Sequence, residues 1–430
     1  QHLKLIKTAA MKLDRCQMIR FDPVNGGFHS TELGRVASHF YIQYETIQLF
    51  NEFFAKATGK KKKPRSSQVF LGERQDEHVV LVSKEEQDEE AAELEGTIDP
   101  RNIVMSDADL IAIVAESSEF TNVQTRDEEM DELEKLEQLC PLEVKSGEKS
   151  QLKVNVLIQA YISQTPIESF SLVSDMAYIS QNTGRIFRAL FEITIKKNWP
   201  RVALQFLRFC KMVEHRLWIN AHPLRQFELL SPQVMMRLEE RRMTIDRLLD
   251  LSPEEITNVV RGNITIGRKV LSVVKNFPRL NVTATVQPVT RTVIKLHLVI
   301  TADFVWNEKI HGTVEPWHIW IEDTAQSFIY HNEYFLLHRA QKDEPQHMTL
   351  IVPIEDPPPS QYQIHIISDR WLGAETIETI PFDTLILPHE YPPHTTLLPL
   401  QPLQLQCLQN PKFESIYNFT HFNAVQTQVS

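Results

Sequence analysis

The sequence comprises 430 residues with a formal net charge of −11, and 42% of the residues are hydrophobic and 23% charged. This composition is that of globular proteins and excludes a wholly disordered chain, a collagen and a membrane-embedded bundle. At roughly 150 residues per domain we expect about three domains. The four cysteines lie far apart and form no CxxC pair, so neither a zinc finger nor a disulfide scaffold is expected, and the thiols fit a reducing compartment.

Residues 1–29 predict the end of a winged-helix domain. Apolar residues keep helical spacing as far as Leu13, a short strand follows at 17–21, and Asn25-Gly26-Gly27 predicts the turn of a hairpin. The chain starts with Gln1 inside this helical pattern, so we expect it to be a fragment of a longer protein.

The next segment, 30–54, predicts one amphipathic helix that opens on the capping signal Ser30-Thr31-Glu32. Residues 55–102 then form a predicted insertion that begins with a lysine run and ends in an acidic run. We expect most of this insertion to be disordered. The lysine run fits a nuclear address or, more commonly, a charged linker.

Helical patterns continue through residues 103–230, and with 30–54 they predict one helical bundle over 30–230. The helices are expected at 107–119, 126–139, 151–163, 172–197 and 200–218. A compact helix-loop-helix unit is expected at 231–280, where Ser252-Pro253-Glu254-Glu255 is a capping box with proline at the first helical position.

From residue 281 the hydrophobic period changes to two, which predicts β-strands. Seven short strands at this spacing favour an antiparallel sandwich of the immunoglobulin or fibronectin type over 281–403. The fold class is therefore α+β and multidomain, with a linker at 404–430. The strands are expected at 282–286, 293–300, 317–321, 328–337, 348–354, 362–368 and 375–380.

Charge is unevenly distributed along the chain. Residues 73–99 and 116–137 carry net charges of −9 and −7, whereas residues 181–279 carry +9. A basic region of this kind can face nucleic-acid phosphates. A solvated helical surface is the alternative, and charge alone does not separate the two.

Motifs of autonomous enzymes are absent from the sequence. It contains no GxxxxGK[ST] phosphate loop, no GxSxG elbow and no HExxH pair. His311, His318 and His331 fall in or near predicted strands and could meet in space, but they lack the close spacing of zinc ligands. We therefore expect no catalytic site, no metal and no cofactor within this chain.

The predicted helix at 178–197 has a polar stripe opposite its apolar face. The stripe consists of Gln181, Arg185, Arg188, Glu192 and Lys196. Two arginines one turn apart can hold successive phosphates or stack on bases. The alternative is a solvent face with an Arg188–Glu192 pair.

The helix-loop-helix unit offers a second basic cluster. Backbone N–H groups at a helix start can bind phosphate, and Arg261, Arg268, Lys269 and Lys275 add positive charge nearby. An ordinary helical packing module fits the same spacing.

Specific strings then indicate a family, over about 1–54 and 103–430. The strings include Phe187–Ile193 followed by Trp199-Pro200, His215–Trp218, Pro223–Phe227, Gln287–Thr292, Glu333–Phe335, Ser368–Gly373 and Leu385–Pro388. With these strings the chain closely resembles the accessory module that follows the motor domains in Ski-two-like superfamily-two helicases, a module also found in a translocon protein of the endoplasmic reticulum.

The tail 417–428 resembles the start of a further motor cassette. In the family this stretch carries the motif whose glutamine reads adenine, so Phe422 and Gln426 become nucleotide-binding candidates, although Ala424 replaces the usual proline. The resemblance thus implies a two-cassette parent. Asn418–Asn423 and Trp371–Glu375 favour one such member over the spliceosomal one.

The resemblance implies that helix 178–197 is the "ratchet" helix beneath a nucleic-acid channel. It makes Arg185 and Arg188 the best strand-contact candidates, with Gln181, Lys196, Arg268 and Lys269 as further ones. The implied partners are flanking motor domains, single-stranded RNA or DNA and other subunits of a complex, without a membrane. ATP and Mg would act in the parent, where 3′-to-5′ unwinding, alkylation-damage repair and ribosome rescue are implied, in the nucleus and cytosol. The alternatives are a translocon-type scaffold without nucleic acid, the equivalent module of the two-cassette spliceosomal RNA helicase, and a purely protein-binding scaffold.

Overall fold

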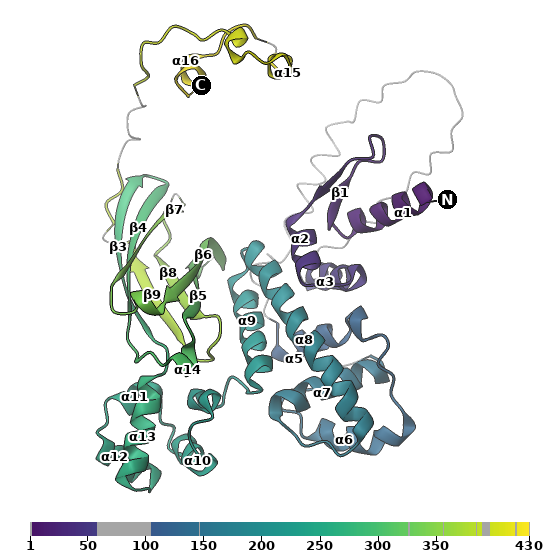
Figure 1. Cartoon of the computed structure of the whole chain (residues 1–430), viewed down its shortest axis with the longest axis vertical. Coiled ribbons are helices and arrows are strands. Elements are labelled where there is room, and N and C mark those ends of the chain that lie inside the picture. The colour runs from purple at the N-terminus through teal and green to yellow at the C-terminus, as the bar shows by residue number, and fades with distance from the viewer. Residues whose placement is uncertain are drawn as a thin grey trace.

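The computed structural model describes residues 2–57, 105–145, 147–325, 327–355, 357–383, 385–388, 396–417 and 419–429. The predicted insertion lies outside these residues from position 58 onward, as does Asn418 of the tail. Figure 1 shows the chain running from a helical N-terminal part through a helical bundle to a β-rich part.

The N-terminal part contains the predicted helix and hairpin. Helix α1 spans His2–Arg15, and strands β1 (Ile19–Phe21) and β2 (Phe28–Ser30) pair antiparallel. The single helix expected at 30–54 is wrong, because the segment forms α2 (Glu32–His39) and α3 (Tyr44–Ala57).

The break between α2 and α3 comes from the backbone and from a distant carboxylate. Tyr41 has a left-handed φ of 53°, which no continuous right-handed helix accommodates. The N–H of Gln43, just before α3, donates to the Glu119 carboxylate at 2.9 Å. Glu119 is 76 residues away, so the periodicity of 30–54 carried no sign of it.

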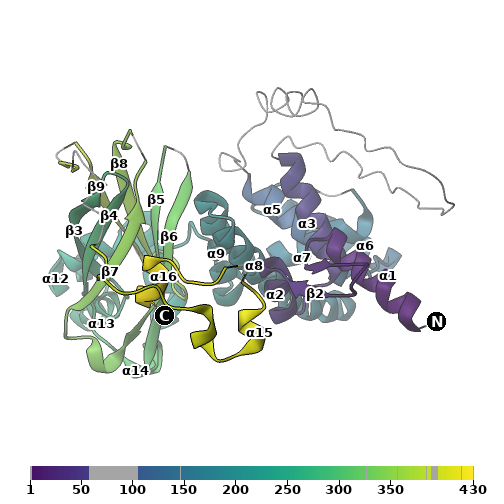
Figure 2. The ribbon, with the colours of Figure 1, turned by 90° about the horizontal axis from the view of Figure 1, so that it is seen from above.

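Among the residues from 105 to 230 that the structure describes, five helices form the bundle: α5 (Asp107–Ala115), α6 (Met130–Gln138), α7 (Lys149–Ser163), α8 (Phe170–Lys196) and α9 (Pro200–His215). Pro200 stands in the first turn of α9, where its missing N–H costs nothing. The central helix α8 is the longest of the described helices, and its C-terminal half packs between neighbours. Figure 2 shows α8 and α9 between the β-rich part and the N-terminal helices.

A 3₁₀ turn (Pro223–Phe227) precedes the predicted helix-loop-helix region, which contains α10 (Pro232–Glu240), α11 (Ile245–Leu249), α12 (Pro253–Val260) and α13 (Ile264–Lys275). The predicted capping box is present, with Ser252 as the cap and Glu255 reaching back to it. Gly267 lets α13 approach α12 closely, since a Cβ there would collide with Thr257 and with the carbonyl of Pro253.

Seven strands form two antiparallel sheets, at the positions that the alternating pattern predicts. One sheet has the order β3-β4-β7 and the other β6-β5-β8-β9. Their inward residues share one hydrophobic core, so the sheets pack face to face. The strands are β3 (Leu280–Thr290), β4 (Val293–Ala302), β5 (Val314–Asp323), β6 (Phe328–His338), β7 (Gln346–Pro353), β8 (Gln361–Ser368) and β9 (Glu375–Pro381). The fold is thus a mixture of helices and antiparallel sheets.

Short elements complete the chain. Helix α14 (Glu308–His311) precedes β5, and the C-terminal segment holds a 3₁₀ turn (Leu405–Leu408), α15 (Pro411–Glu414) and α16 (Ala424–Val429). None of the described helices is long and apolar enough to span a bilayer.

Candidate nucleic-acid interface

The first feature of the site is an open stripe along the N-terminal half of α8. Phe170, the first residue of the helix, is 87% exposed, and Ser174, Ala177 and Gln181 follow at helical spacing, all exposed. The stripe combines one exposed ring with small and amide side chains. Sequence analysis found only its part from Gln181 onward, although the same spacing extends back to Phe170.

Arg185 continues this stripe and is half-buried. One terminal nitrogen donates to Asn182 Oδ1 at 2.6 Å, whereas Nε is buried and has no hydrogen-bond partner among the described residues. A buried N–H without an acceptor is unfavourable, so the Arg185 guanidinium is under-bonded in this structure.

Arg188, one turn further, is tied to the sheet domain. Its Nη1 and Nη2 contact the two carboxylate oxygens of Asp369, at 2.5 and 3.0 Å. Burial alone would raise the pKa of Asp369, but hydrogen bonds from His318 and Arg188 bring that pKa well below its usual range. The strand contact predicted for Arg188 remains a prediction, and its present partner is a carboxylate.

Two hollows flank the Arg188–Asp369 pair. One, of about 520 Å³, lies between the C-terminal half of α8, the end of α2 and strands β5 and β6, and its lining includes Phe40, Glu192 and Tyr334. The other, of about 510 Å³, is lined by Gly184 of α8, Glu214 of α9 and Arg370 of the sheet domain. Arg188 lines both hollows, so its guanidinium lies between them.

The other predicted strand contacts are dispersed. Lys196 ends the stripe and pairs with Glu32 of α2 at 2.9 Å, both side chains being exposed. Arg268 and Lys269 are exposed on α13, which Figure 1 places below the sheets and away from α8. Arg268 lines a hollow of about 230 Å³ with Lys275. The structure therefore brings Gln181, Arg185 and Arg188 together and leaves the α13 cluster separate.

A loop of the sheet domain, Ser368–Gly373, holds the bundle in place. The fully buried Lys211 of α9 donates to the carbonyls of Ser368 and Trp371 at 3.0 and 3.3 Å. His215 stacks on Trp371 with ring centroids 5.4 Å apart. The Leu372 N–H donates to Gln226 at 2.7 Å. Sequence analysis used this loop only as a family string, because its partners lie more than 140 residues away.

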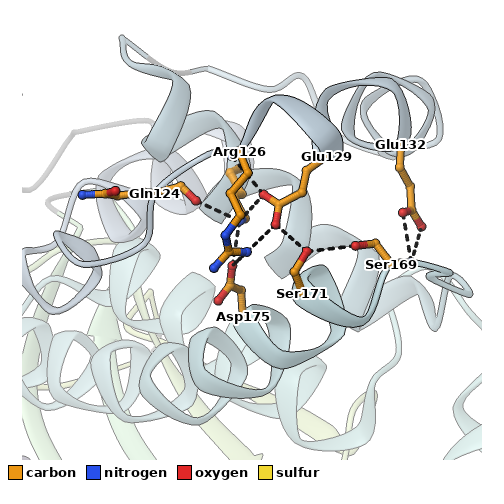
Figure 3. A network of polar contacts seen from close by, with 8 residues as sticks. Gln124, Arg126, Glu129, Glu132, Ser169, Ser171 and Asp175 are labelled. Carbon is orange, nitrogen blue, oxygen red and sulfur yellow. Dashed lines mark hydrogen bonds and ion pairs between the residues drawn. The ribbon is translucent and has the colours of Figure 1, made fainter.

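The N-terminal half of α8 is held by a buried polar network (Figure 3). Lys153 of α7, 0% exposed, donates to Glu129, to Asp175 of α8 and to the Gln124 carbonyl at 2.6, 2.6 and 3.0 Å. Burial raises the pKa of Glu129, but hydrogen bonds led by that from Lys153 outweigh it and lower the pKa to about 2. The network fixes the end of α8 that carries the open stripe.

The predicted nucleotide-binding residues lie in the C-terminal segment. Gln426 and Asn423 bond reciprocally across the start of α16, at 2.8 and 3.0 Å. Phe422 is buried and its ring packs near those of Tyr417 and Phe419.

The histidines considered as metal ligands do not converge. His311 is buried and bonds Asn276, His318 bonds Asp369, and His331 Nε2 is buried without a partner. Across the ranges that the structure describes, no three His, Cys, Asp or Glu side chains are placed to hold a metal ion.

Comparison with known proteins identifies the family. The family model of the Sec63 Brl domain matches residues 30–63 and 99–381. The chain belongs to the Sec63 Brl domain family. The stretch between the two matched segments, 64–98, falls within the predicted insertion.

Curated relatives extend the similarity over nearly the whole chain. Activating signal cointegrator 1 complex subunit 3 is 42% identical over 431 residues in Gallus gallus and 43% identical in Homo sapiens, covering 99% of this chain and 17% of each relative. The U5 small nuclear ribonucleoprotein 200 kDa helicase of Homo sapiens is 38% identical over 432 residues, covering 100% of this chain and 18% of the relative. The chain therefore spans less than a fifth of the length of these relatives.

These alignments confirm the resemblance inferred from the strings. The sequence strings favoured the cointegrator subunit over the spliceosomal helicase, and the former is the more similar of the two. The alignments span 99% of the chain, whereas the family model leaves 64–98 unmatched, within the stretch 55–102 that the strings did not include.

Proposed function

We propose that this Sec63 Brl module is the non-catalytic channel floor of an ATP-dependent helicase and grips single-stranded RNA or DNA along α8. The observation that carries the proposal is the open stripe of Phe170, Gln181 and Arg185, in which an exposed ring and an under-bonded guanidinium share one helix face. Exposed rings stack on bases without sequence preference, and arginine adds charge to the grip.

The relatives support this proposal through their names. One is named an ATP-dependent RNA helicase, DExH14 of Arabidopsis thaliana, 42% identical over 429 residues. In such a parent, ATP and Mg would act in flanking motor domains, and Phe422 and Gln426 would belong to the next cassette. Unwinding in the 3′-to-5′ direction, alkylation repair, ribosome rescue, other complex subunits and a nuclear and cytosolic location follow as parts of the same proposal.

The domain division belongs to the proposal as well. We assign residues 1–29 to a winged helix, 30–230 to the ratchet bundle, 231–280 to the helix-loop-helix and 281–403 to an immunoglobulin-like sandwich. Three- and four-stranded antiparallel sheets sharing one core support the sandwich assignment.

The test measures strand binding by this chain with a fluorescent 20-nucleotide RNA or DNA at 50 mM salt. Arg185→Ala should weaken binding roughly tenfold, which is about 1.4 kcal/mol and comparable to the loss of one base-stacking contact on a single strand, about 1–3 kcal/mol. Arg241→Ala removes an equal charge from an exposed position of the helix-loop-helix region, and should change affinity less than twofold. Equal effects of the two variants would show that the stripe does not carry binding.

A second measurement addresses the parent. In a full-length helicase carrying this module, Arg185→Ala plus Arg188→Ala should lower unwinding more than ATP binding. Arg185→Ala alone is the sharper variant, because Arg188→Ala also removes the pair with Asp369. Unchanged unwinding in both variants would refute the ratchet assignment.

A further inference from the structure

The ion pair of Arg188 and Asp369 lies on the stripe that we propose binds a nucleic-acid strand. We propose that the Asp369 carboxylate occupies the position beside Arg188 where a phosphate of the bound strand would lie. The phosphate displaces the carboxylate, so that Arg188 exchanges one anionic partner for another. This inference rests on the proposed function, since it needs a strand along α8.

The geometry of the pair is the geometry of phosphate recognition. Both terminal nitrogens of Arg188 face both oxygens of Asp369, the two-pronged arrangement in which a guanidinium also holds two phosphate oxygens. Arg188 lies one turn beyond Arg185 on the same stripe, so a backbone that passes Arg185 comes next to Arg188.

Neither partner is left isolated when the pair opens. Asp369 still accepts from His318 Nε2 at 2.8 Å and from the Tyr334 hydroxyl at 3.4 Å. Arg188 keeps Glu192 at 3.9 Å and the ring of Phe191, whose centroid lies 5.3 Å from its guanidinium carbon. A buried charge stripped of all partners would be costly, and the exchange avoids that cost on both sides.

Space for the incoming group lies beside the guanidinium. Arg188 lines both hollows, of about 520 and 510 Å³, and Asp369 lines the second of them as well. A phosphate can therefore approach Arg188 through open space beside its present partner. Tyr334, which borders the larger hollow, is half exposed and offers a ring beside it.

The consequence is competition between two anions for one arginine. Asp369 weakens strand binding in the wild-type chain, because every strand contact at Arg188 must first break the pair. Loss of the carboxylate should then add one full phosphate contact, and each such contact on single strands steepens the dependence of log affinity on log salt by about 0.7.

The test compares salt dependences of strand binding by the full chain, using the same labelled 20-nucleotide strands between 50 and 300 mM salt. Asp369→Asn should raise affinity roughly fivefold at 50 mM salt and steepen the slope by up to about 0.7. Adding Arg188→Gln to Asp369→Asn should abolish both gains. Thermal melting verifies that each variant is folded.

The matched control is Glu375→Gln. Glu375 pairs with Arg208 of α9 at 2.9 Å, so this change also removes a carboxylate between bundle and sheets without freeing Arg188. An equal gain in Glu375→Gln would show that loosening of the junction, and not the release of Arg188, raises affinity.

The outcomes also separate this inference from the proposed function. If wild-type chain binds no strand, or Arg185→Ala has no effect, the proposed function fails. If Arg185→Ala weakens binding while Asp369→Asn leaves slope and affinity unchanged, only the exchange fails. If Asp369→Asn does not fold, Arg188→Gln alone tests the exchange. The exchange predicts that Arg188→Gln makes the salt dependence of binding less steep than in the wild type. If Arg188 stays paired with Asp369 when the strand binds, Arg188→Gln leaves the salt dependence unchanged.

Discussion

Replacement of Lys153 by methionine gives the strongest stability prediction for the bundle. Methionine keeps the length and apolar stem of the side chain but removes the ammonium that contacts Glu129 and Asp175. Two carboxylates are then left side by side without their buried ammonium partner, and only the half-exposed Arg126 still contacts both of them. Removing one partner of a buried ion pair costs about 3–5 kcal/mol.

The pKa of Glu129 yields an independent magnitude. A fall from the ordinary 4.5 to about 2 corresponds to about 3 kcal/mol of native-state stabilisation of the carboxylate. Because the folded pKa is lowered, this stability is complete above pH 4.5 and is lost as pH falls toward 2. Arg126 and Ser171 contribute to this shift and still contact Glu129 in the variant. We therefore expect Lys153→Met to lower the free energy of unfolding by about 3 kcal/mol at pH 7, the lower end of the range for a broken buried pair.

The assay is urea-dependent hydrogen exchange read on peptides of α7, which reports the free energy of opening of the bundle alone. The matched control is Lys145→Met. Lys145 pairs with Asp109 at 2.9 Å, but the two side chains are 41% and 37% exposed, and pairs of this kind contribute at most about 1 kcal/mol.

Two results would refute this reasoning. One is a decrease in the opening free energy below 1 kcal/mol for Lys153→Met, which could not be distinguished from that of Lys145→Met. The other is a difference in opening free energy between wild type and Lys153→Met that stays constant from pH 7 down to pH 3. Loss of the ammonium must reduce the part of the acid sensitivity that comes from Glu129, so this difference should shrink as the pH falls.

Further predictions concern the sheet domain and the helix-loop-helix. Burial raises the pKa of Glu315 to about 7 despite the Trp371 indole N–H and Arg370 beside it, so the folded state binds the extra proton and wild-type stability should fall as pH rises from 4.5 to 7. Glu315→Gln should remove that slope in urea titrations, and an unchanged slope would contradict the assignment. Gly267→Ala should cost about 1–3 kcal/mol or more by forcing α13 from α12, whereas Gly184→Ala, with its nearest neighbour at 3.7 Å, should stabilise by about 0.5–1 kcal/mol; equal melting shifts would contradict the close approach.

Local patterns in the sequence determined the secondary structure and one face of the site. The seven strands follow from alternation with period two, and the stripe from Gln181 to Lys196 follows from helical spacing, because both periods are properties of neighbouring residues. The capping box at Ser252 is equally local. The family resemblance also came from contiguous strings.

Only the tertiary structure decided which polar side chains are exposed and which are paired with distant residues. Arg188 meets Asp369 across 181 residues, and α2 is separated from α3 with help from Glu119. Lys153 would be assigned to a solvent face by its charge, yet it is fully buried. A periodic pattern tells which way a side chain points from its own helix, but the partner that awaits it is set by how distant segments pack.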